Sequence, residues 1–204
     1  RLFFSLISSM LIVYISGSKL NNIDLSIVDY VLSNYYLAML FTALGITITA
    51  NTWNFIDGLN GLSSGMAVLV LFGYAFLAFD SEAQTLVKLI LIIIFCILPF
   101  LIINTFTGKL FLGDGGAYLI GSLIGWLGVE LTFRLETISP WSIFLIIIYP
   151  ATEFIFSFLR RVITKKSPFQ DDAFHLHSLL YSNLMRHKSK RSSFCTPSKR
   201  NKPS

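Results

Sequence analysis

The chain has 204 residues, of which 54% are hydrophobic and only 13% are charged, and its mean hydropathy is +0.69. Soluble domains usually carry about 25% charged residues, so this composition excludes a soluble enzyme and indicates a membrane protein. The net charge of +5 is uneven, because residues 160–204 hold eleven Lys/Arg and two Asp, whereas residues 1–159 hold five Lys/Arg and nine Asp/Glu. A basic end after a hydrophobic block is typical of a cytoplasmic segment beside anionic lipid and does not indicate nucleic-acid binding.

Six apolar segments follow one another along the chain, most of them near the length that crosses a bilayer as a helix. They are residues 2–15, 27–50, 62–79, 86–103, 117–133 and 141–159. We expect all six to be helices, because backbone in contact with lipid must satisfy its own hydrogen bonds. The first is short for a full crossing, and the second is expected to be helical only from about Tyr35.

The predicted fold class is therefore all-α: a polytopic membrane protein with about six transmembrane helices. Residues 1–182 form the membrane-embedded domain in this prediction. Residues 183–204, which are rich in Lys, Arg and Ser, are predicted to be a disordered, basic cytoplasmic tail.

The basic cluster at residues 160–166 sets the predicted orientation. Because short cytoplasmic loops are enriched in Lys and Arg, this cluster is placed in the cytoplasm and the other loops follow by alternation. Loops 16–26, 80–85 and 134–140 then lie outside, and loops 51–61 and 104–116 lie inside with the tail. Nearly every polar side chain outside the apolar segments that could take part in a reaction is in the inside segments, so the sequence predicts active-site loops on the cytoplasmic face.

The first polar motif is Asn51-Thr-Trp-Asn54-Phe-Ile-Asp57-Gly58-Leu-Asn60-Gly61. Steps of three residues put Asn51, Asn54 and Asp57 on one side of a helical surface. A polar helix end that stops at its glycines would also produce this pattern. Three amide or carboxylate groups beside lipid are costly, however, and this favours a functional role.

The second motif is Phe111-Leu-Gly113-Asp114-Gly115-Gly116-Ala-Tyr118-Leu-Ile-Gly121, a single carboxylate among glycines that lead into a membrane helix. Glycines allow the backbone to approach a ligand closely, and a helix N-terminus favours phosphate. Since a carboxylate would repel a phosphate, we expect Mg²⁺ between them, which commonly binds one or two carboxylates and substrate phosphates. A flexible turn with a capping Asp is the alternative.

The third motif, Asp171-Asp172-Ala-Phe-His175-Leu-His177, follows the basic cluster. Two histidines beside acids could bind metal, hold a diphosphate as imidazolium ions or relay protons. A solvated loop next to the membrane is the alternative for this motif alone, but three polar motifs on one predicted face are harder to explain as surface.

Two further acids lie inside predicted helices. Glu130 is expected to reach the outer interface. Glu153 is expected either to line the cytoplasmic site or to pair with Arg160 or Arg161.

The strings NTWNFIDGLNGL, FLGDGGAYLIG and DDAFHLHSLLY, in this order, resemble the polyprenyl-phosphate hexose-1-phosphate transferases, also called glycosyl transferase family 4. The resemblance covers most of residues 1–182. It implies an enzyme of the bacterial inner membrane that moves a sugar-1-phosphate from a UDP-sugar to undecaprenyl phosphate, releases UMP and uses Mg²⁺ as its cofactor. An N-acetylhexosamine as the sugar, a role in starting cell-envelope polysaccharides such as O-antigen, and a homodimer are further implications of the family likeness.

The resemblance also implies roles for individual residues. Asp57 and Asp114 match the acids of the family's motifs, which implies catalysis and metal binding. Substrate binding is implied for the other polar positions of the three motifs, namely Asn51, Asn54, Asn60, Asp172, His175 and His177. Asn60 stands where many members carry a second Asp, which could weaken a metal contact or mark a different subgroup. The His-Leu-His-Ser run is less histidine-rich than that of the peptidoglycan enzyme, so muramoyl-pentapeptide is a poor candidate for the substrate.

Family members carry an adjacent acidic pair upstream of the first motif, and no such pair occurs between Arg1 and Asn51. We therefore expect the chain to be part of a longer protein and the 204 residues alone to be poorly active or inactive. Two other classes stay open: a transporter or channel, which would place polar residues near the bilayer midplane, and an inactive remnant that serves as a membrane partner. UMP release from a UDP-sugar would separate the transferase from both.

Overall fold

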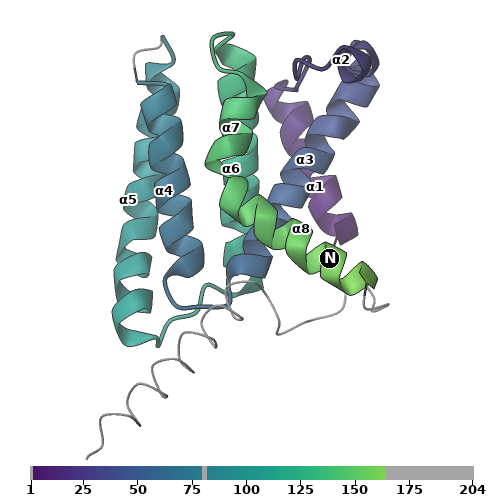
Figure 1. Cartoon of the computed structure of the whole chain (residues 1–204). Coiled ribbons are helices and arrows are strands. Elements are labelled where there is room, and N and C mark those ends of the chain that lie inside the picture. Colours follow the sequence, from purple (N-terminus) through teal and green to yellow (C-terminus); the bar gives the residue numbers. More distant parts are fainter. Residues whose placement is uncertain (1, 80–81, 164–204) are drawn as a thin grey trace, which may run out of the picture. The chain divides into compact units, whose positions relative to one another are not determined.

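The computed structural model describes residues 2–79 and 82–163, and these residues form α-helices and no β-strand. The helices are α1 (Leu2–Ser16), α2 (Ser26–Leu32), α3 (Tyr35–Ile56), α4 (Leu62–Leu77), α5 (Gln84–Thr107), α6 (Gly113–Arg134), α7 (Pro140–Ile146) and α8 (Ile148–Ile163), shown in Figure 1. The prediction of an all-α fold is confirmed for this part of the chain. Residues 1–155 form one compact unit, and the packing described below lies within it.

Three of these helices are long and apolar enough to cross a membrane. They are α3, α5 and α6, with 22, 24 and 22 residues. The apolar helices α1 and α4 are shorter, at 15 and 16 residues, and α7 with α8 passes the same test only as a pair. By length and composition, the described residues thus support three membrane spans, or four if the bent pair counts as one span, instead of the six that were predicted.

The second predicted segment, residues 27–50, is divided between α2 and α3. Asn34 caps the start of α3: its side chain accepts hydrogen bonds from the backbone N–H groups of Tyr36 and Leu37 at 3.0 and 3.3 Å. An Asn at this position caps the free N–H groups at a helix start. The predicted helix start near Tyr35 is confirmed, but the expectation that the residues before it are not helical is wrong, because Ser26–Leu32 form α2.

The prediction of one helix over residues 141–159 is wrong. α7 ends at Ile146, α8 begins at Ile148, and the two helices are bent by 74°. Pro150 explains the break, because proline has no N–H to donate to the carbonyl of Ile146 and its ring would clash with that carbonyl in a continuous helix.

Helices α3 and α6 share the most extensive contact of any helix pair in the described unit. Two glycines of α6 make this approach possible. A methyl group at Gly121 would lie 2.7 Å from the Cα atom of Ala50, and one at Gly125 would lie 3.2 Å from the Cα atom of Ile46. Small residues allow two helix backbones to pack this closely. The contact brings the last turns of α3 beside the first turn of α6, and we call this end of the helix pair the site end.

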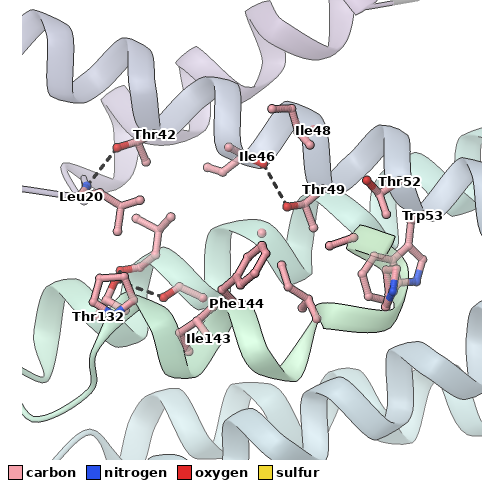
Figure 2. A pocket seen from close by; sticks show the side chains of 18 of the residues that line it. Leu20, Thr42, Ile46, Ile48, Thr49, Thr52, Trp53, Thr132, Ile143 and Phe144 are labelled. Atoms are coloured by element: carbon pink, nitrogen blue, oxygen red, sulfur yellow. Dashed lines mark hydrogen bonds between the residues drawn. The ribbon is translucent and has the colours of Figure 1, made fainter. Parts of the chain in front are cut away.

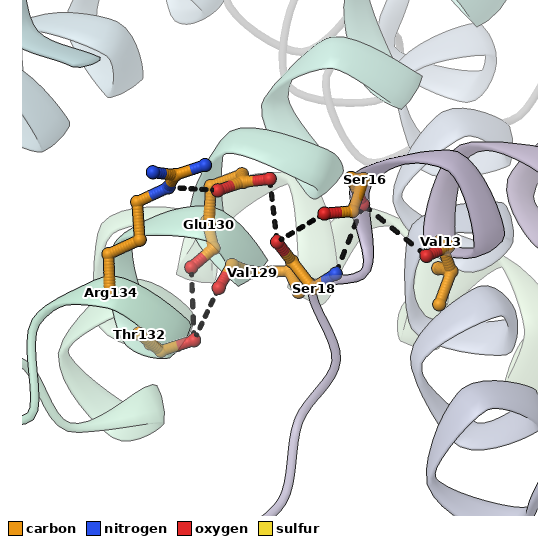
Figure 3. A network of polar contacts seen from close by, with 8 residues as sticks. Val13, Ser16, Ser18, Val129, Glu130, Thr132 and Arg134 are labelled. Atoms are coloured by element: carbon orange, nitrogen blue, oxygen red, sulfur yellow. Dashed lines mark hydrogen bonds and ion pairs between the residues drawn. The ribbon is translucent and has the colours of Figure 1, made fainter. Parts of the chain in front are cut away.

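The opposite end of α6 holds a buried carboxylate, Glu130, which is 1% exposed. The Ser18 hydroxyl donates to its Oε1 atom at 2.7 Å, and the Arg134 guanidinium donates from Nε to its Oε2 atom at 2.6 Å (Figure 3). Protein thus encloses this carboxylate, and the expectation that Glu130 reaches the outer interface of the membrane stays a prediction. These two partners compensate a charge that would otherwise be costly to bury.

Candidate functional site

The polar residues of the first motif lie on the last turns of α3 and directly after it. Asn51 and Asn54 are helical, because α3 continues to Ile56, and Asp57 is the residue at which the helix stops. The predicted loop over residues 51–61 is therefore shorter than expected. Trp53 explains part of this extension: it is fully buried, and its ring N–H donates to the carbonyl of Ser63 at 3.3 Å, so packing holds this turn in place.

The acid of the second motif also lies on a helix. α6 begins at Gly113, four residues before the predicted start, and Asp114 is in its first turn. A negative side chain there interacts favourably with the partial positive charge of the helix N-terminus. The structure thus places the two acids, Asp57 and Asp114, at the meeting ends of α3 and α6.

The two motifs are in direct contact. The Asn54 side chain donates from Nδ2 to the Oδ1 atom of Asp114 at 3.1 Å. Partial burial, and then the negative charge of Asp114, raise the pKa of Asp57 above its ordinary value. Asp57 is half-buried and Asp114 is exposed, so the two carboxylates border one region that solvent reaches. The structure thus brings these three residues together, and their roles in a site stay a prediction.

A second contact joins the same helices one turn away. The Tyr118 hydroxyl donates to the Oδ1 atom of Asn51 at 3.1 Å. Tyr118 was not among the predicted site residues, although it follows Asp114 by four residues and such residues share a helix face. That spacing is the signal by which the sequence could have indicated it.

Asn104 of α5 was also missed, although it organises the loops next to the site. It is 6% exposed, its Oδ1 atom accepts from the backbone N–H of Gly61, and its Nδ2 atom donates to the carbonyl of Leu110. One side chain thus fixes the loop after α3 and the loop before α6. A polar residue at the end of an otherwise apolar run is the only sequence signal for this role.

Asn60, the remaining residue of the first motif, is exposed and lies beside the loop after α5. A methyl group at Gly108 would lie 2.7 Å from its Nδ2 atom, and Gly108 has a positive φ of 60°, which favours glycine. Asp172, His175 and His177 lie outside the described residues, so their part in the site stays a prediction.

The site end fits Mg²⁺ by the chemistry of its side chains. The described residues contain no group of three or more His, Cys, Asp or Glu side chains that could enclose a metal ion. Mg²⁺ does not require such a group, since it usually keeps several waters and binds one or two carboxylates together with substrate phosphates. Asp57 and Asp114 would supply those carboxylates. The side-chain carbonyl oxygen of Asn54 is a further oxygen ligand of the type that Mg²⁺ accepts.

An apolar cavity of about 370 Å³ lies beside α3. Figure 2 shows Thr49, Thr52 and Trp53 of α3 on one side of it and Ile143 and Phe144 of α7 near the other. Residues of α6 and of the first part of α8 also line it, as do Leu20 and Tyr74. The cavity therefore reaches the turn of α3 that precedes Asn54, and the bend between α7 and α8 contributes to its shape.

Glu153 of α8 is fully buried in the same unit, and its Oε1 atom accepts from the Tyr149 hydroxyl at 3.0 Å. The sequence predicts that Glu153 either lines the cytoplasmic site or pairs with Arg160 or Arg161. The structure adds Tyr149 as a partner that lies one turn before it on the same helix.

These features define a class: an all-helical membrane protein with an acidic site where two helix ends meet. The chain belongs to glycosyl transferase family 4, whose family model matches residues 1–132. The family resemblance seen in the motifs is confirmed.

Named relatives support the same family. A probable undecaprenyl-phosphate N-acetylglucosaminyl 1-phosphate transferase of Bacillus subtilis is 30% identical over 154 residues, which are 75% of this chain and 43% of that protein. The undecaprenyl-phosphate alpha-N-acetylglucosaminyl 1-phosphate transferase of Escherichia coli is 28% identical over 144 residues, which are 68% of this chain and 39% of that protein. The chain thus spans less than half the length of these relatives. No solved structure matches it.

Proposed function

We propose that this chain forms part of a membrane transferase that moves an N-acetylhexosamine-1-phosphate from a UDP-sugar to a polyprenyl phosphate and releases UMP. The observation that carries this proposal is the meeting of Asp57, Asn54 and Asp114 at the ends of α3 and α6. Both relatives described above are named as transferases that act on undecaprenyl phosphate and an N-acetylglucosaminyl 1-phosphate group, which supports the substrate classes.

In the proposed reaction, a phosphate oxygen of the lipid forms a bond to the phosphorus that carries the sugar. The bond from this phosphorus to the bridging oxygen of the diphosphate breaks, and that oxygen leaves with UMP. Phosphoryl transfer of this kind depends mainly on alignment of the reactants and on neutralisation of charge. Mg²⁺, when bound, would offset the negative charge of the diphosphate.

The chain's own residues supply the geometry for this reaction. Asp57 and Asp114 would hold the cation, and the hydrogen bond from Asn54 orients the Asp114 carboxylate. Asn104 fixes the loops on both sides of the acids, so these loops do not have to be ordered when the substrate binds. The exposure of Asp114 leaves the site open to a soluble nucleotide.

The apolar cavity beside α3 suits the chain of the lipid acceptor (Figure 2). Its walls are mainly apolar side chains together with a few threonines, and the residues of α3 that line it include Thr52 and Trp53, just before Asn54. An isoprenoid chain in this cavity would keep its phosphate near the site end. Thus the lipid and the soluble nucleotide could reach the same pair of acids from different sides.

Three further points belong to the proposal. We expect the site end to face the cytoplasm of a bacterial inner membrane, because the positive-inside rule places the basic cluster at residues 160–166 there and the predicted loops follow by alternation. The reaction starts the synthesis of a cell-envelope polysaccharide such as O-antigen, as expected for the family. Asp172, His175 and His177 bind the nucleotide-sugar, and a homodimer stays a prediction by analogy.

The test is Asp114→Asn in the intact protein, reconstituted in lipid nanodiscs with UDP-N-acetylglucosamine, undecaprenyl phosphate and Mg²⁺. We expect UMP release to fall by at least about 100-fold, the scale on which loss of one preorganised charge-stabilising group acts, while the thermal unfolding midpoint is retained. Glu136→Gln is the matched control, because Glu136 is exposed and lies beyond the opposite end of α6. Full activity of Asp114→Asn would refute the assignment.

A further inference from the structure

Helices α3 and α6 are joined at the site end by two successive side-chain hydrogen bonds. The first runs from Asn54 to Asp114, and the second runs from Tyr118 to Asn51, each at 3.1 Å. Asn51 precedes Asn54 by three residues and Tyr118 follows Asp114 by four, so each pair lies on one face of its helix. The second hydrogen bond thus joins the same two helix faces one turn further from the helix ends.

The amide group of Asn51 is occupied within the protein. The residue is 8% exposed, and its Nδ2 atom donates to the carbonyl of Thr47 at 2.7 Å and to the Ser5 hydroxyl of α1 at 3.4 Å. Its Oδ1 atom accepts from Tyr118. An Asn side chain has two donor hydrogens and one carbonyl oxygen, so each of its polar atoms already has a partner. This arrangement fits contacts between helices better than contact with a soluble nucleotide.

The rest of the contact between α3 and α6 is close packing of the two helices. Beyond Tyr118, α6 presents Gly121 and Gly125 to the backbone of α3. Close packing of small residues holds helices together, whereas a buried polar pair specifies one register. A slip by one residue would move Asp114 by about 1.5 Å along the helix axis. Misplacement of about 1 Å can cost about 100-fold in rate.

We propose that Asn51 and Tyr118 are positioning residues, and that their hydrogen bond sets the height of Asp114 relative to Asp57. Asn51 then acts through α6 and does not bind substrate, which replaces the role that the family resemblance implied for it. This inference rests on the proposed function, because it assumes that Asp57 and Asp114 form the site of the transferase reaction.

The test is a double-mutant cycle in the intact protein in nanodiscs, with Tyr118→Phe, Asn51→Leu and both together. We expect each single variant to lower kcat by about 10-fold or more, to leave KM for UDP-N-acetylglucosamine within about twofold, and to weaken binding of Mn²⁺ measured by electron paramagnetic resonance without substrates. The double variant should be no worse than the poorer single variant, because both changes remove the same contact.

Tyr14→Phe is the matched control, since Tyr14 lies near the far end of α1 and is 70% exposed. Tyr118→Phe removes one hydroxyl group only, so this arm stands even if Asn51→Leu does not fold. The inference is overturned if Tyr118→Phe leaves both kcat and Mn²⁺ affinity unchanged, or if the two substitutions act additively and Asn51→Leu raises KM. A wild-type protein that releases no UMP would defeat the proposed function, and the Mn²⁺ measurements would then decide the positioning role on their own.

Discussion

At the scale of single residues, the site combines two acids that repel each other. The pKa of Asp57 is raised first by burial and then by the charge of Asp114, so folding brings together two groups that are less favourable as a pair of anions than apart. Active sites commonly hold such unfavourable arrangements because a ligand relieves them. A divalent cation is the ligand that would do so here.

Asp57→Asn should therefore separate stability from function. Without Mg²⁺ at neutral pH, we expect a small rise in the thermal unfolding midpoint, because one of the repelling charges is gone and solvent partly screens the interaction. UMP release should fall by at least about 100-fold. Mg²⁺ should stabilise the wild-type protein more than the variant, since a ligand stabilises only the form that binds it. Equal stabilisation of both proteins by Mg²⁺ would contradict a role of Asp57 in metal binding.

The motifs and the family resemblance predict Asp57, Asn54 and Asp114 as site residues, and in the structure these three lie together. The motifs alone do not indicate Asn104 or Tyr118. Their roles depend on which loops and helices meet in space, and a single polar residue at the end of an apolar run does not carry that information. Asn51 shows the converse, because its position in the motif implies a ligand contact while its amide group is bonded to three parts of the protein.

At the scale of helices, the close contact of α3 and α6 positions the site. Gly121 is the tightest point, since a methyl group there would also lie 3.0 Å from the carbonyl oxygen of Thr49 and 2.8 Å from the Cβ atom of Trp53. Both neighbours belong to the backbone or directly adjoin it, so they can move only if the helices separate.

Gly121→Ala should destabilise the protein by about 1–3 kcal/mol, the usual effect of overpacking a well-packed contact. It should also lower UMP release, because the acids on α3 and α6 would move apart. Gly65→Ala is the control, since Gly65 is a helical residue of α4 outside the apolar cavity, where an added methyl group would meet only the Leu101 side chain at 3.7 Å. Alanine at such a position is neutral or slightly stabilising. Equal unfolding midpoints for the two variants would show that the helix contact tolerates a larger separation.

The buried Glu130 ties the loop after α1 to the far end of α6 (Figure 3). Ser18→Ala should destabilise the protein by about 1–3 kcal/mol, because it leaves a buried carboxylate with one partner fewer. Ser33→Ala is the comparison, since its exposed hydroxyl bonds only to a neighbouring carbonyl. If chemical unfolding gives the same free energy for both variants, the Ser18 contact contributes no more than a surface hydrogen bond. UMP release should be unchanged in Ser18→Ala, as the contact lies at the opposite end of α6 from Asp114.

Helix existence was easier to predict than helix continuity. Apolar content located the long helices, but α2 at Ser26–Leu32 was missed, because the second segment was expected to be helical only from about Tyr35. Over residues 141–159 an unbroken apolar run gave no indication of the 74° bend. Pro150 was the available signal, but a proline in an apolar run can also lie in a merely kinked helix. At the other break, Asn34 has an unambiguous capping role, and the start of α3 was predicted correctly.

At the scale of the whole molecule, a cytoplasmic nucleotide can be the donor only if the site end faces the cytoplasm. Single cysteines introduced at Lys109 and at Asn22, in a protein whose native cysteines are replaced, would report on the two ends, because both positions are exposed. We expect a membrane-impermeant maleimide to label position 22 in intact spheroplasts and position 109 only after permeabilisation. The reverse pattern would place the acids on the outer face and would exclude a cytoplasmic nucleotide as the donor.

The most direct test of the central claim is UMP release from UDP-N-acetylglucosamine by the intact protein in nanodiscs, measured with and without undecaprenyl phosphate and Mg²⁺. The account predicts release only when both are present, together with formation of the sugar diphosphate lipid. Absence of UMP under all conditions, or release that does not depend on the lipid phosphate, would contradict the claim that Asp57 and Asp114 serve a sugar-phosphate transfer to a membrane lipid.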